Sequence, residues 1–316
     1  MVIDPVARRT DGESVRIARD VLCAGAGAKI CLPEGPEEFA RALARRGQRR
    51  PVVIGDDRAL LRVVGLLHKE RELDRVSVSM VPVGAPATVS LSRALGVPTD
   101  TVAAARTVLD GGERTLDLLT DESDGIVLGG LRIPCGEAQE QGGCGSGAHP
   151  VPGARAADGH RPWWEPAART ARTALGLLAP TAGLGLGGRR VGDSPAHGGP
   201  SARAKPRVGE LLRAWGKVPT HRLRIEADGV VLADLDRPVR AVSVAPGATG
   251  SGSGALGLAQ IEVRWPGEAR PVRARARAVT VSGADFHYRA DAVVGGPVRT
   301  RTWTVQAGAW RLTVPR

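Results

Sequence analysis

The chain has 316 residues, of which 42% are hydrophobic and 24% are charged, as in ordinary globular proteins. This composition excludes wholesale disorder, a collagen-like chain and a small disulfide-stapled domain. The length lies at the upper end of one domain and suits two. Only 3% of the residues are aromatic, so we expect a core built mainly from aliphatic side chains.

The charge is distributed unevenly. Lysine and arginine together number 44 against 33 acidic residues, a formal net charge of +11. Residues 1–134 hold equal numbers of basic and acidic side chains, so the whole excess lies in residues 135–316. That half is the candidate for contact with an anionic partner. Arginine far outnumbers lysine, a bias typical of GC-rich coding DNA, so part of this charge can reflect composition alone.

The four cysteines lie at positions 23, 31, 135 and 144, and none forms a CxxC pair. Free thiols in a reducing compartment are the simpler interpretation, and a zinc site formed by Cys135, Cys144 and His149 is the less favoured one. The sequence has no apolar run of 18 residues and no signal-peptide pattern at its start. We expect a cytoplasmic protein, with peripheral contact to a membrane as an extension of that expectation.

Residues 1–134 alternate short apolar runs, expected as buried strands, with amphipathic stretches expected as helices. The expected strands are 2–3, 28–32, 51–55, 76–83, 115–119 and 125–133. The expected helices are 14–23 with Ser14 as N-cap, 36–46, 59–72 and one that starts at Thr99-Asp100 and ends at 111–112. This alternation predicts a parallel sheet in an α/β domain. The first strand is short, which favours a true start further upstream.

Residues 135–206 are rich in glycine and proline and predict a linker, with one helix near residues 163–179. From His221 onward the hydrophobic period changes to two, which is typical of strands. The expected strands are 221–234 with a turn at Asp228-Gly229, 241–245, 259–265, 272–281, 285–292, 300–305 and 310–314. Residues 207–316 therefore predict an all-β, sandwich-like domain.

In the expected strand 272–281, Arg273, Arg275 and Arg277 share one face. A solvated face is the plainer interpretation. Contact of these arginines with phosphate or lipid head groups is the functional alternative.

Two stretches of the first half carry a pattern of motifs. PVVIGDDRALLRVV places Gly55, Asp57 and Ala59 after a buried strand at the first Gly, the Asp and the Thr of a GGDGT motif. VSVSMVPVGAPATVSLSRALGVP has Pro82 and Gly84 where a PxGT-type loop stands, followed by an ARxLGxP-like stretch at residues 92–98. In this order and spacing the stretches resemble the superfamily of diacylglycerol, sphingosine and NAD kinases.

Further motifs support the same resemblance. Ile3-Asp4-Pro5 resembles the Asn-Pro that follows the first strand of the family, and Asp117 falls on the Asp of a later strand. The closing RTRTWTVQAGAWRLTVP looks like the last strands of the lipid kinases. The resemblance covers residues 1–134 and 220–316 and implies a nucleotide-binding α/β domain followed by a β-sandwich.

The resemblance also implies a chemistry, namely transfer of a phosphoryl group from ATP, with Mg²⁺, to a lipid hydroxyl. The implied ATP-binding residues are Asp4, Gly55, Asp56, Asp57, Arg58 and Gly84, with Asp57 as the metal ligand. The implied partner is a lipid substrate or an anionic membrane surface. A homodimer is a further expectation.

Two departures from the family pattern concern this chemistry. Asp56 and Arg58 replace glycines whose backbone would approach the phosphates closely. Asp56 adds negative charge where a triphosphate would lie, whereas Arg58 offers a guanidinium to it.

No motif in the sequence identifies the base that would accept the proton of the lipid hydroxyl, so the catalytic residue stays unassigned. Asp228 lies in an expected hairpin, and Glu262, Asp285 and Asp291 are the remaining acidic candidates.

Three functions therefore stand at the level of the sequence. The first is an ATP-dependent lipid kinase of the diacylglycerol kinase type, weakened by its altered loop. The second is an inactive pseudokinase that binds nucleotide or anionic lipid. The third is an arginine-rich nucleic-acid-binding protein, which is disfavoured because no helix-turn-helix, zinc finger or aromatic-interleaved basic patch is found. We expect no specific nucleic acid as a partner.

Overall fold

The computed structural model describes residues 1–135, 220–247 and 257–316. The expected linker from residue 136 on, including its helix near 163–179, lies outside the described residues. Within the described ranges, no helix is both long enough and apolar enough to span a membrane.

The N-terminal half is built on a parallel sheet of short strands. β1 (Val2–Ile3), β2 (Val52–Gly55) and β3 (Ser77–Pro82) pair in that order, all parallel. The strands are almost wholly buried because helices cover both faces, so they show no polar alternation. The expected strands 2–3, 51–55 and 76–83 are confirmed to within one residue at each end.

Neighbouring strand residues point to opposite faces of the sheet and enter two separate cores. Val53 and Met80 pack with α3 and α4, whereas Ile54 and Val81 pack with α1, α2 and α6. The helices are α1 (Pro5–Thr10), α2 (Gly12–Gly25), α3 (Pro36–Ala44), α4 (Asp57–Lys69), α5 (Ser90–Ala94) and α6 (Thr101–Asp110).

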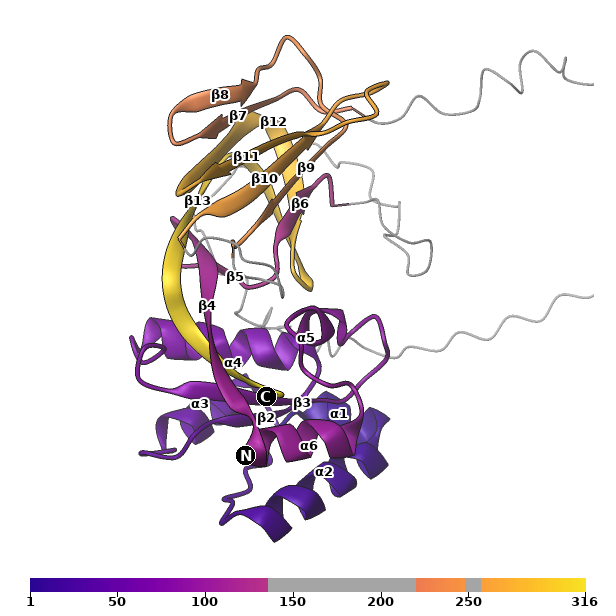
Figure 1. Cartoon of the computed structure of the whole chain (residues 1–316), viewed down its shortest axis with the longest axis vertical. Coiled ribbons are helices and arrows are strands. Elements are labelled where there is room, and N and C mark those ends of the chain that lie inside the picture. The colour runs from indigo at the N-terminus through magenta and orange to yellow at the C-terminus, as the bar shows by residue number, and fades with distance from the viewer. Residues whose placement is uncertain (136–219, 248–256) are drawn as a thin grey trace, which may run out of the picture. The chain divides into compact units, whose positions relative to one another are not determined.

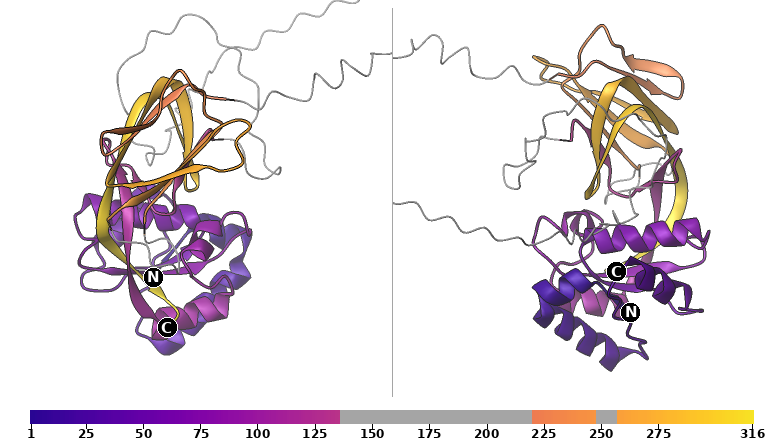
Figure 2. Two further views of the ribbon diagram at one scale, coloured as in Figure 1. Left: turned by 45° about the horizontal axis from the view of Figure 1, so that its top comes forward. Right: turned by 180° about the vertical axis from the view of Figure 1, so that it is seen from behind.

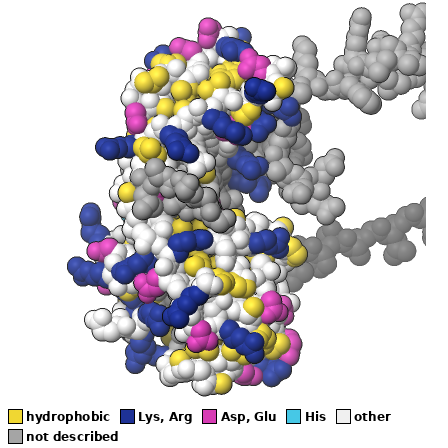
Figure 3. All heavy atoms as spheres, viewed as in Figure 1, with side chains coloured by type: hydrophobic (Ala, Val, Ile, Leu, Met, Phe, Trp, Pro, Cys, Tyr) yellow, Lys and Arg dark blue, Asp and Glu magenta, His cyan; other side chains and the backbone are white. Residues whose placement is uncertain are grey.

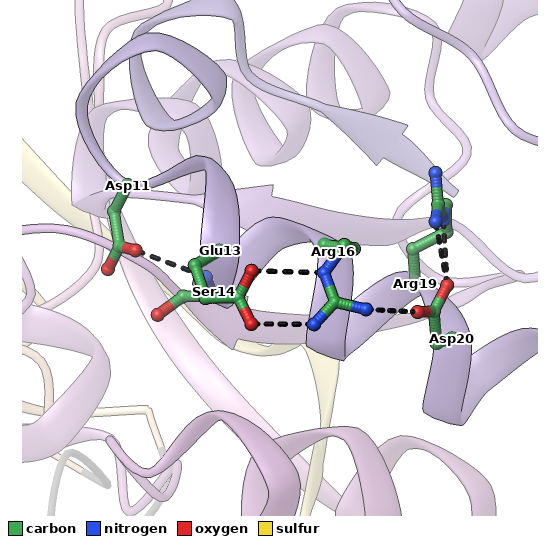
Figure 4. Close-up of polar contacts among 6 residues, drawn as sticks. All are labelled: Asp11, Glu13, Ser14, Arg16, Arg19 and Asp20. Carbon is green, nitrogen blue, oxygen red and sulfur yellow. Dashed lines mark hydrogen bonds and ion pairs between the residues drawn. The ribbon is translucent and has the colours of Figure 1, made fainter.

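Two local expectations are wrong. Ser14 is not the N-cap of its helix: α2 begins at Gly12, and the Asp11 side chain caps it by accepting from the Ser14 backbone N–H at 3.1 Å (Figure 4). Residues 28–32 form no strand, only an isolated bridge between Cys31 and Val2. They lie outside the edge strand β1, where Cys31 packs against the core but Ile30 and Leu32 stay exposed.

The exposed side of α2 carries a ladder of charges. Arg16 pairs with Glu13 at 2.6 Å and with Asp20 at 3.2 Å, and Arg19 also binds Asp20 (Figure 4). Such exposed pairs stabilise a helix by about 0.3–0.5 kcal/mol each. This helix face is therefore a solvated surface.

The C-terminal half is rich in β-structure. Its strands, with those that lead into it, are β4 (Gly112–Asp121), β5 (Ile126–Val127), β6 (Leu131–Ile133), β7 (Leu223–Ala227), β8 (Val230–Ala233), β9 (Ala241–Ala245), β10 (Ala259–Arg264), β11 (Val272–Ala276), β12 (Ala278–Ala290) and β13 (Val293–Val314). The fold is thus an α/β part followed by a β-rich part, as the sequence predicts.

The strand β12 organises the β-rich part. One edge of β12 pairs with β13, and the other edge pairs first with β7 and then with β6, from which β9, β10 and β11 continue. The core between these strands holds Trp303, Phe286 and Tyr288. The expected hairpin at Asp228-Gly229 joins β7 to β8, and both turn residues have positive φ, 49° and 84°, as the favoured two-residue hairpin turn requires.

The last strand, β13, belongs to both halves. Its first part pairs with β12, and its end pairs in parallel with β3 through Arg311 and Leu312, so it becomes the fourth strand of the parallel sheet (Figures 1 and 2). Thr313 on this strand shares a buried hydroxyl hydrogen bond of 2.8 Å with Ser79 on β3. The separate strands expected at 300–305 and 310–314 are one strand with a bulge between Gln306 and Trp310.

Trp310 couples β13 to the α/β core, where its side chain is 1% exposed. We expect Trp310→Ala to lower the free energy of unfolding by about 3–5 kcal/mol, because it leaves a cavity that the core cannot fill. Denaturant unfolding measures this loss. The control is Val294→Ala on the same strand, where the side chain is 47% exposed and the expected change is below about 0.5 kcal/mol. Equal effects of the two substitutions would contradict this role of Trp310.

Candidate functional site

The carboxyl ends of three parallel strands meet at one edge of the sheet. Asp4 follows β1, Asp56 and Asp57 follow β2, and Gly84 comes two residues after β3. In open α/β sheets, ligands bind outside this edge. The structure therefore brings the residues expected from the sequence to one place.

The approach of β1 to β2 requires glycine at position 55. A Cβ added to Gly55 would lie 2.8 Å from the Asp4 Cβ and 3.0 Å from the Ala59 Cβ. Gly84 has a φ of +151°, and a Cβ there would lie 2.6 Å from the Thr88 hydroxyl. Both expected glycines are thus fixed by close packing within the chain.

Asp4 is 4% exposed and caps the first helix. Its Oδ2 accepts hydrogen bonds from the Val6 and Ala7 backbone N–H groups at 2.9 and 3.2 Å. Its Oδ1 lies 3.6 Å from the Arg62 guanidinium. The carboxylate thus accepts hydrogen bonds from the first N–H groups of α1, which would otherwise be available to bind an anionic ligand.

Asp56 is the N-cap of α4, as Asp4 is of α1. Its Oδ1 accepts from the Ala59 backbone N–H at 3.1 Å. Burial raises the pKa of Asp56, the hydrogen bond opposes this shift, and the nearby charge of Asp4 adds to it. Arg58, on the first turn of α4, is exposed, and it is the basic residue nearest to Asp56 along the chain.

Asp57 is 2% exposed and holds the fifth helix in place. Oδ2 accepts from the Leu91 N–H at 2.8 Å, and Oδ1 accepts from the Ser92 N–H at 2.9 Å and from the Ser92 hydroxyl at 2.7 Å. Both oxygens are therefore engaged inside the protein. The sequence did not show this role because α5 is a short helix that its pattern does not predict.

These contacts do not fit a magnesium ion held by Asp57. N–H donors already face both carboxylate oxygens, and the side chain is 2% exposed, so it presents no open coordination position to an ion. In the part of the chain that the structure describes, no three His, Cys, Asp or Glu side chains are grouped as metal ligands would be. Cys23, Cys31 and Cys135 are free thiols, and the zinc site weighed for Cys135 involves residues outside the described ranges.

A fourth carboxylate reaches the edge from the β-rich part. Asp291, in the turn between β12 and β13, accepts from the backbone N–H groups of Leu128, Gly129 and Gly130 at 2.7, 2.8 and 3.0 Å. It also adopts a left-handed conformation, with φ +48°, which costs energy for a residue other than glycine.

Asp291 and Asp57 are linked through packed neighbours. Leu91, which donates to Asp57, lies so close to Gly129, which donates to Asp291, that a Cβ on Gly129 would be 2.6 Å from the Leu91 side chain. Burial raises the pKa of Asp291 to about 6, the three N–H groups oppose this shift, and the charge of Asp57 adds to it. Such a pKa is a feature of functional carboxyl groups.

The other acidic candidates lie in structural roles. Asp228 accepts from the Arg277 and Ala278 N–H groups and ties its hairpin to β12. Asp285 pairs with Arg299 on the surface, and Glu262 pairs with Arg264 and Arg273. Asp117, 2% exposed, accepts from the Gly257 and Gly308 N–H groups at 2.7 and 2.8 Å. Of the acids that the sequence left without a motif, Asp291 is the one that reaches the edge.

Comparison with known proteins identifies the fold. No family model matches the sequence, and no curated protein matches it. Two solved structures, each described as a "putative diacylglycerol kinase" from Bacillus anthracis str. Sterne, match with TM-scores of 0.61 and 0.60 at 13% and 12% identity. A third, a diacylglycerol kinase from the same strain, matches with a TM-score of 0.59 at 11% identity. Each match covers 99% of this chain and 95% of the other chain.

The chain therefore has the diacylglycerol kinase fold, and the resemblance seen in the sequence is confirmed at the level of the fold. At 11–13% identity the likeness speaks for the architecture. The carboxylates at the sheet edge determine what chemistry this chain can perform.

The role of Asp57 generates a test. We expect Asp57→Ala to lower the free energy of unfolding by about 3 kcal/mol, because two buried N–H groups and one hydroxyl lose their acceptor. Chemical denaturation measures the loss. The matched control is Asp100→Ala, which removes the exposed N-cap contact with Ala103 on α6 and is expected to cost about 1 kcal/mol. If Asp57→Ala cost no more than this control, Asp57 would be free for a ligand.

Proposed function

We propose that this protein transfers the γ-phosphoryl group of ATP to the hydroxyl of a lipid. The observation that carries the proposal is the placement of Asp291, whose carboxyl is held by the Leu128, Gly129 and Gly130 N–H groups next to Leu91, the residue that donates to Asp57 at the sheet edge. The diacylglycerol kinase fold supports the choice of nucleotide and acceptor.

The chemical step uses few protein groups. The lipid hydroxyl oxygen attacks the γ-phosphorus, its proton passes to an Asp291 oxygen, and the bond from the γ-phosphorus to the β–γ bridging oxygen breaks to release ADP. Asp291 suits the acceptor role because burial raises the pKa of its carboxyl to about 6, so that it is ionised at neutral pH and is a stronger base than an ordinary carboxylate. Its Oδ2 accepts only the Leu128 N–H and keeps a lone pair for the proton. We assign no step to magnesium, since Asp57 does not fit it.

Weak binding of ATP is part of the proposal. Asp4, Asp56 and Asp57 occupy N–H groups at the starts of α1, α4 and α5, which are natural sites for phosphate. The same carboxylates repel a triphosphate. Arg58, exposed beside them, is the group we assign to phosphate contact.

The capping carboxylates favour a second candidate, a pseudokinase that keeps the fold and transfers nothing. The two candidates differ in ATP turnover, so the decisive measurements are ATP affinity and lipid phosphorylation by the full-length protein. Absence of ATP binding up to millimolar concentration would overturn the kinase proposal and leave the pseudokinase.

Asp291 predicts a pH profile. Because the carboxyl must be ionised to accept the proton, we expect turnover to fall about tenfold per pH unit below pH 6 and to be level between pH 7 and 8. Asp291→Asn should remove at least about 99% of the turnover while ATP affinity changes little. The measurement is phosphorylation of diacylglycerol in mixed micelles at saturating ATP.

Asp285→Asn, at an exposed Asp on β12, is the matched control and should keep wild-type turnover. A pH-independent rate would remove Asp291 from the reaction.

Asp56 predicts an unusual gain of affinity. Asp56→Gly removes a negative charge and frees the Ala59 N–H, so we expect tighter binding of ATP by about tenfold, equivalent to about 1.4 kcal/mol. Calorimetric titration measures the change. Asp100→Gly removes a comparable N-cap from α6 and should leave ATP affinity unchanged. An Asp56→Gly variant that bound ATP more weakly would show that this carboxylate assists nucleotide binding.

A further inference from the structure

A hollow on the β-rich part shares no lining residue with the sheet edge or with Asp291. Its volume is about 310 Å³, and it is lined by residues of β6, β9 and β10 with their flanking turns. Three arginines, Arg132, Arg240 and Arg264, and one acid, Glu262, contribute to the lining. The lining therefore carries an excess of positive charge. Figure 3 shows dark blue side chains over this region of the β-rich part.

Strand register places these charges on one face. Arg132 on β6 lies opposite Ser243 on β9, which lies opposite Glu262 on β10. Glu262 in turn lies opposite Arg273 on β11. Directly opposed residues share a face of the sheet. Arg132, Ser243 and Glu262 therefore all face the hollow, and the apolar residues that alternate with them along each strand face the core.

The single acid in the lining is already engaged. One oxygen of Glu262 binds the Arg264 guanidinium, and the other binds Arg273 at 3.2 Å. Glu262 thus orients these two arginines and has no oxygen left without a partner. The positive charge of Arg132 is not neutralised by this carboxylate.

A second observation favours an anionic ligand. On the other side of β6, Arg132 lies directly opposite Arg289 of β12, and like charges in this position are unfavourable. Among the described residues, neither Arg132 nor Arg289 takes part in an ion pair, and both are exposed. Arg289 does not line the hollow, but an anion bound there by Arg132 would reduce the repulsion between the two guanidinium groups.

The chemistry of the lining selects the kind of anion. Guanidinium groups bind phosphate oxygens in pairs with two parallel hydrogen bonds, and the Ser243 hydroxyl adds a further donor. A hollow of about 310 Å³ lies at the lower end of the range for small-molecule sites and holds a phosphorylated head group. Ile133 and Val242 are 1% exposed and belong to the core, so they offer acyl chains no apolar surface in the hollow.

We propose that this hollow is a binding site for a phosphate group, carried either by a phospholipid head group or by a soluble phosphate compound. The site does not depend on the proposed kinase activity, because it shares no residue with the sheet edge. It assigns a specific place to the anionic partner that the charge of the second half suggests.

The test uses the full-length protein and two probes. Inorganic phosphate is titrated by calorimetry, and vesicles of phosphatidylcholine mixed with phosphatidylglycerol are compared with pure phosphatidylcholine vesicles by co-sedimentation. Binding of phosphate alone identifies a soluble compound as the source. Binding to the anionic vesicles that phosphate does not displace identifies a lipid head group.

Substitutions make the site specific. Arg132→Ala should weaken binding of the effective probe about tenfold, and Arg132→Lys should restore only part of it because lysine keeps the charge but loses the paired donors. Arg299→Ala, which removes the same charge from an exposed site outside the hollow, should change binding less than twofold. Absence of binding to both probes, or equal losses in Arg132→Ala and Arg299→Ala, would overturn the proposal. Thermal unfolding of each variant confirms that the fold is kept.

Discussion

The bend of the last strand is the constraint on which both halves of the molecule depend. β13 must leave the β-rich part and enter the parallel sheet beside β3, and it does so through the bulge that follows Gln306. Asp117 holds that bulge by accepting from Gly308, and the same carboxylate accepts from Gly257 after β9. Without this fixed bend, Trp303 and Trp310 could not reach two different cores from one strand.

At the sheet edge, the protein's own carboxylates bind the backbone N–H groups that could otherwise bind an anionic ligand. Asp4, Asp56, Asp57 and Asp291 each accept backbone N–H groups at the sheet edge. Charge-assisted hydrogen bonds of this kind are strong and position the loops accurately. The cost is electrostatic. Burial raises the pKa of Asp56 and of Asp291, and the nearby charge of Asp4 adds to the first shift and that of Asp57 to the second. The edge is therefore well ordered but poorly suited to a triphosphate.

The sequence was informative where hydrophobic pattern and turn chemistry agree. The runs around Val53 and Val78 are buried strands, and Asp228-Gly229 is a hairpin turn, because each depends mainly on local residues. The run at residues 28–32 was misread because burial depends on neighbours that the sequence does not show.

For the candidate site, too, the sequence predicted what depends on local residues and missed what depends on distant contacts. The spacing of the motifs predicted that Asp4, Asp56 and Gly84 belong to one site. The hydrogen bond from the Leu91 N–H to Asp57 joins residues 34 apart in sequence, and the hydrogen bond from the Gly129 N–H to Asp291 joins residues about 160 apart.

The double role of β13 has a consequence for biosynthesis. Residues 293–314 are made last among the elements described, yet they supply a strand to both sheets. Neither half can close its hydrophobic core before β13 has been made, so both must wait for the same 22 residues. Folding of the two halves therefore becomes a single coupled event, and the edge of β3 is open to pairing with other chains until that event occurs.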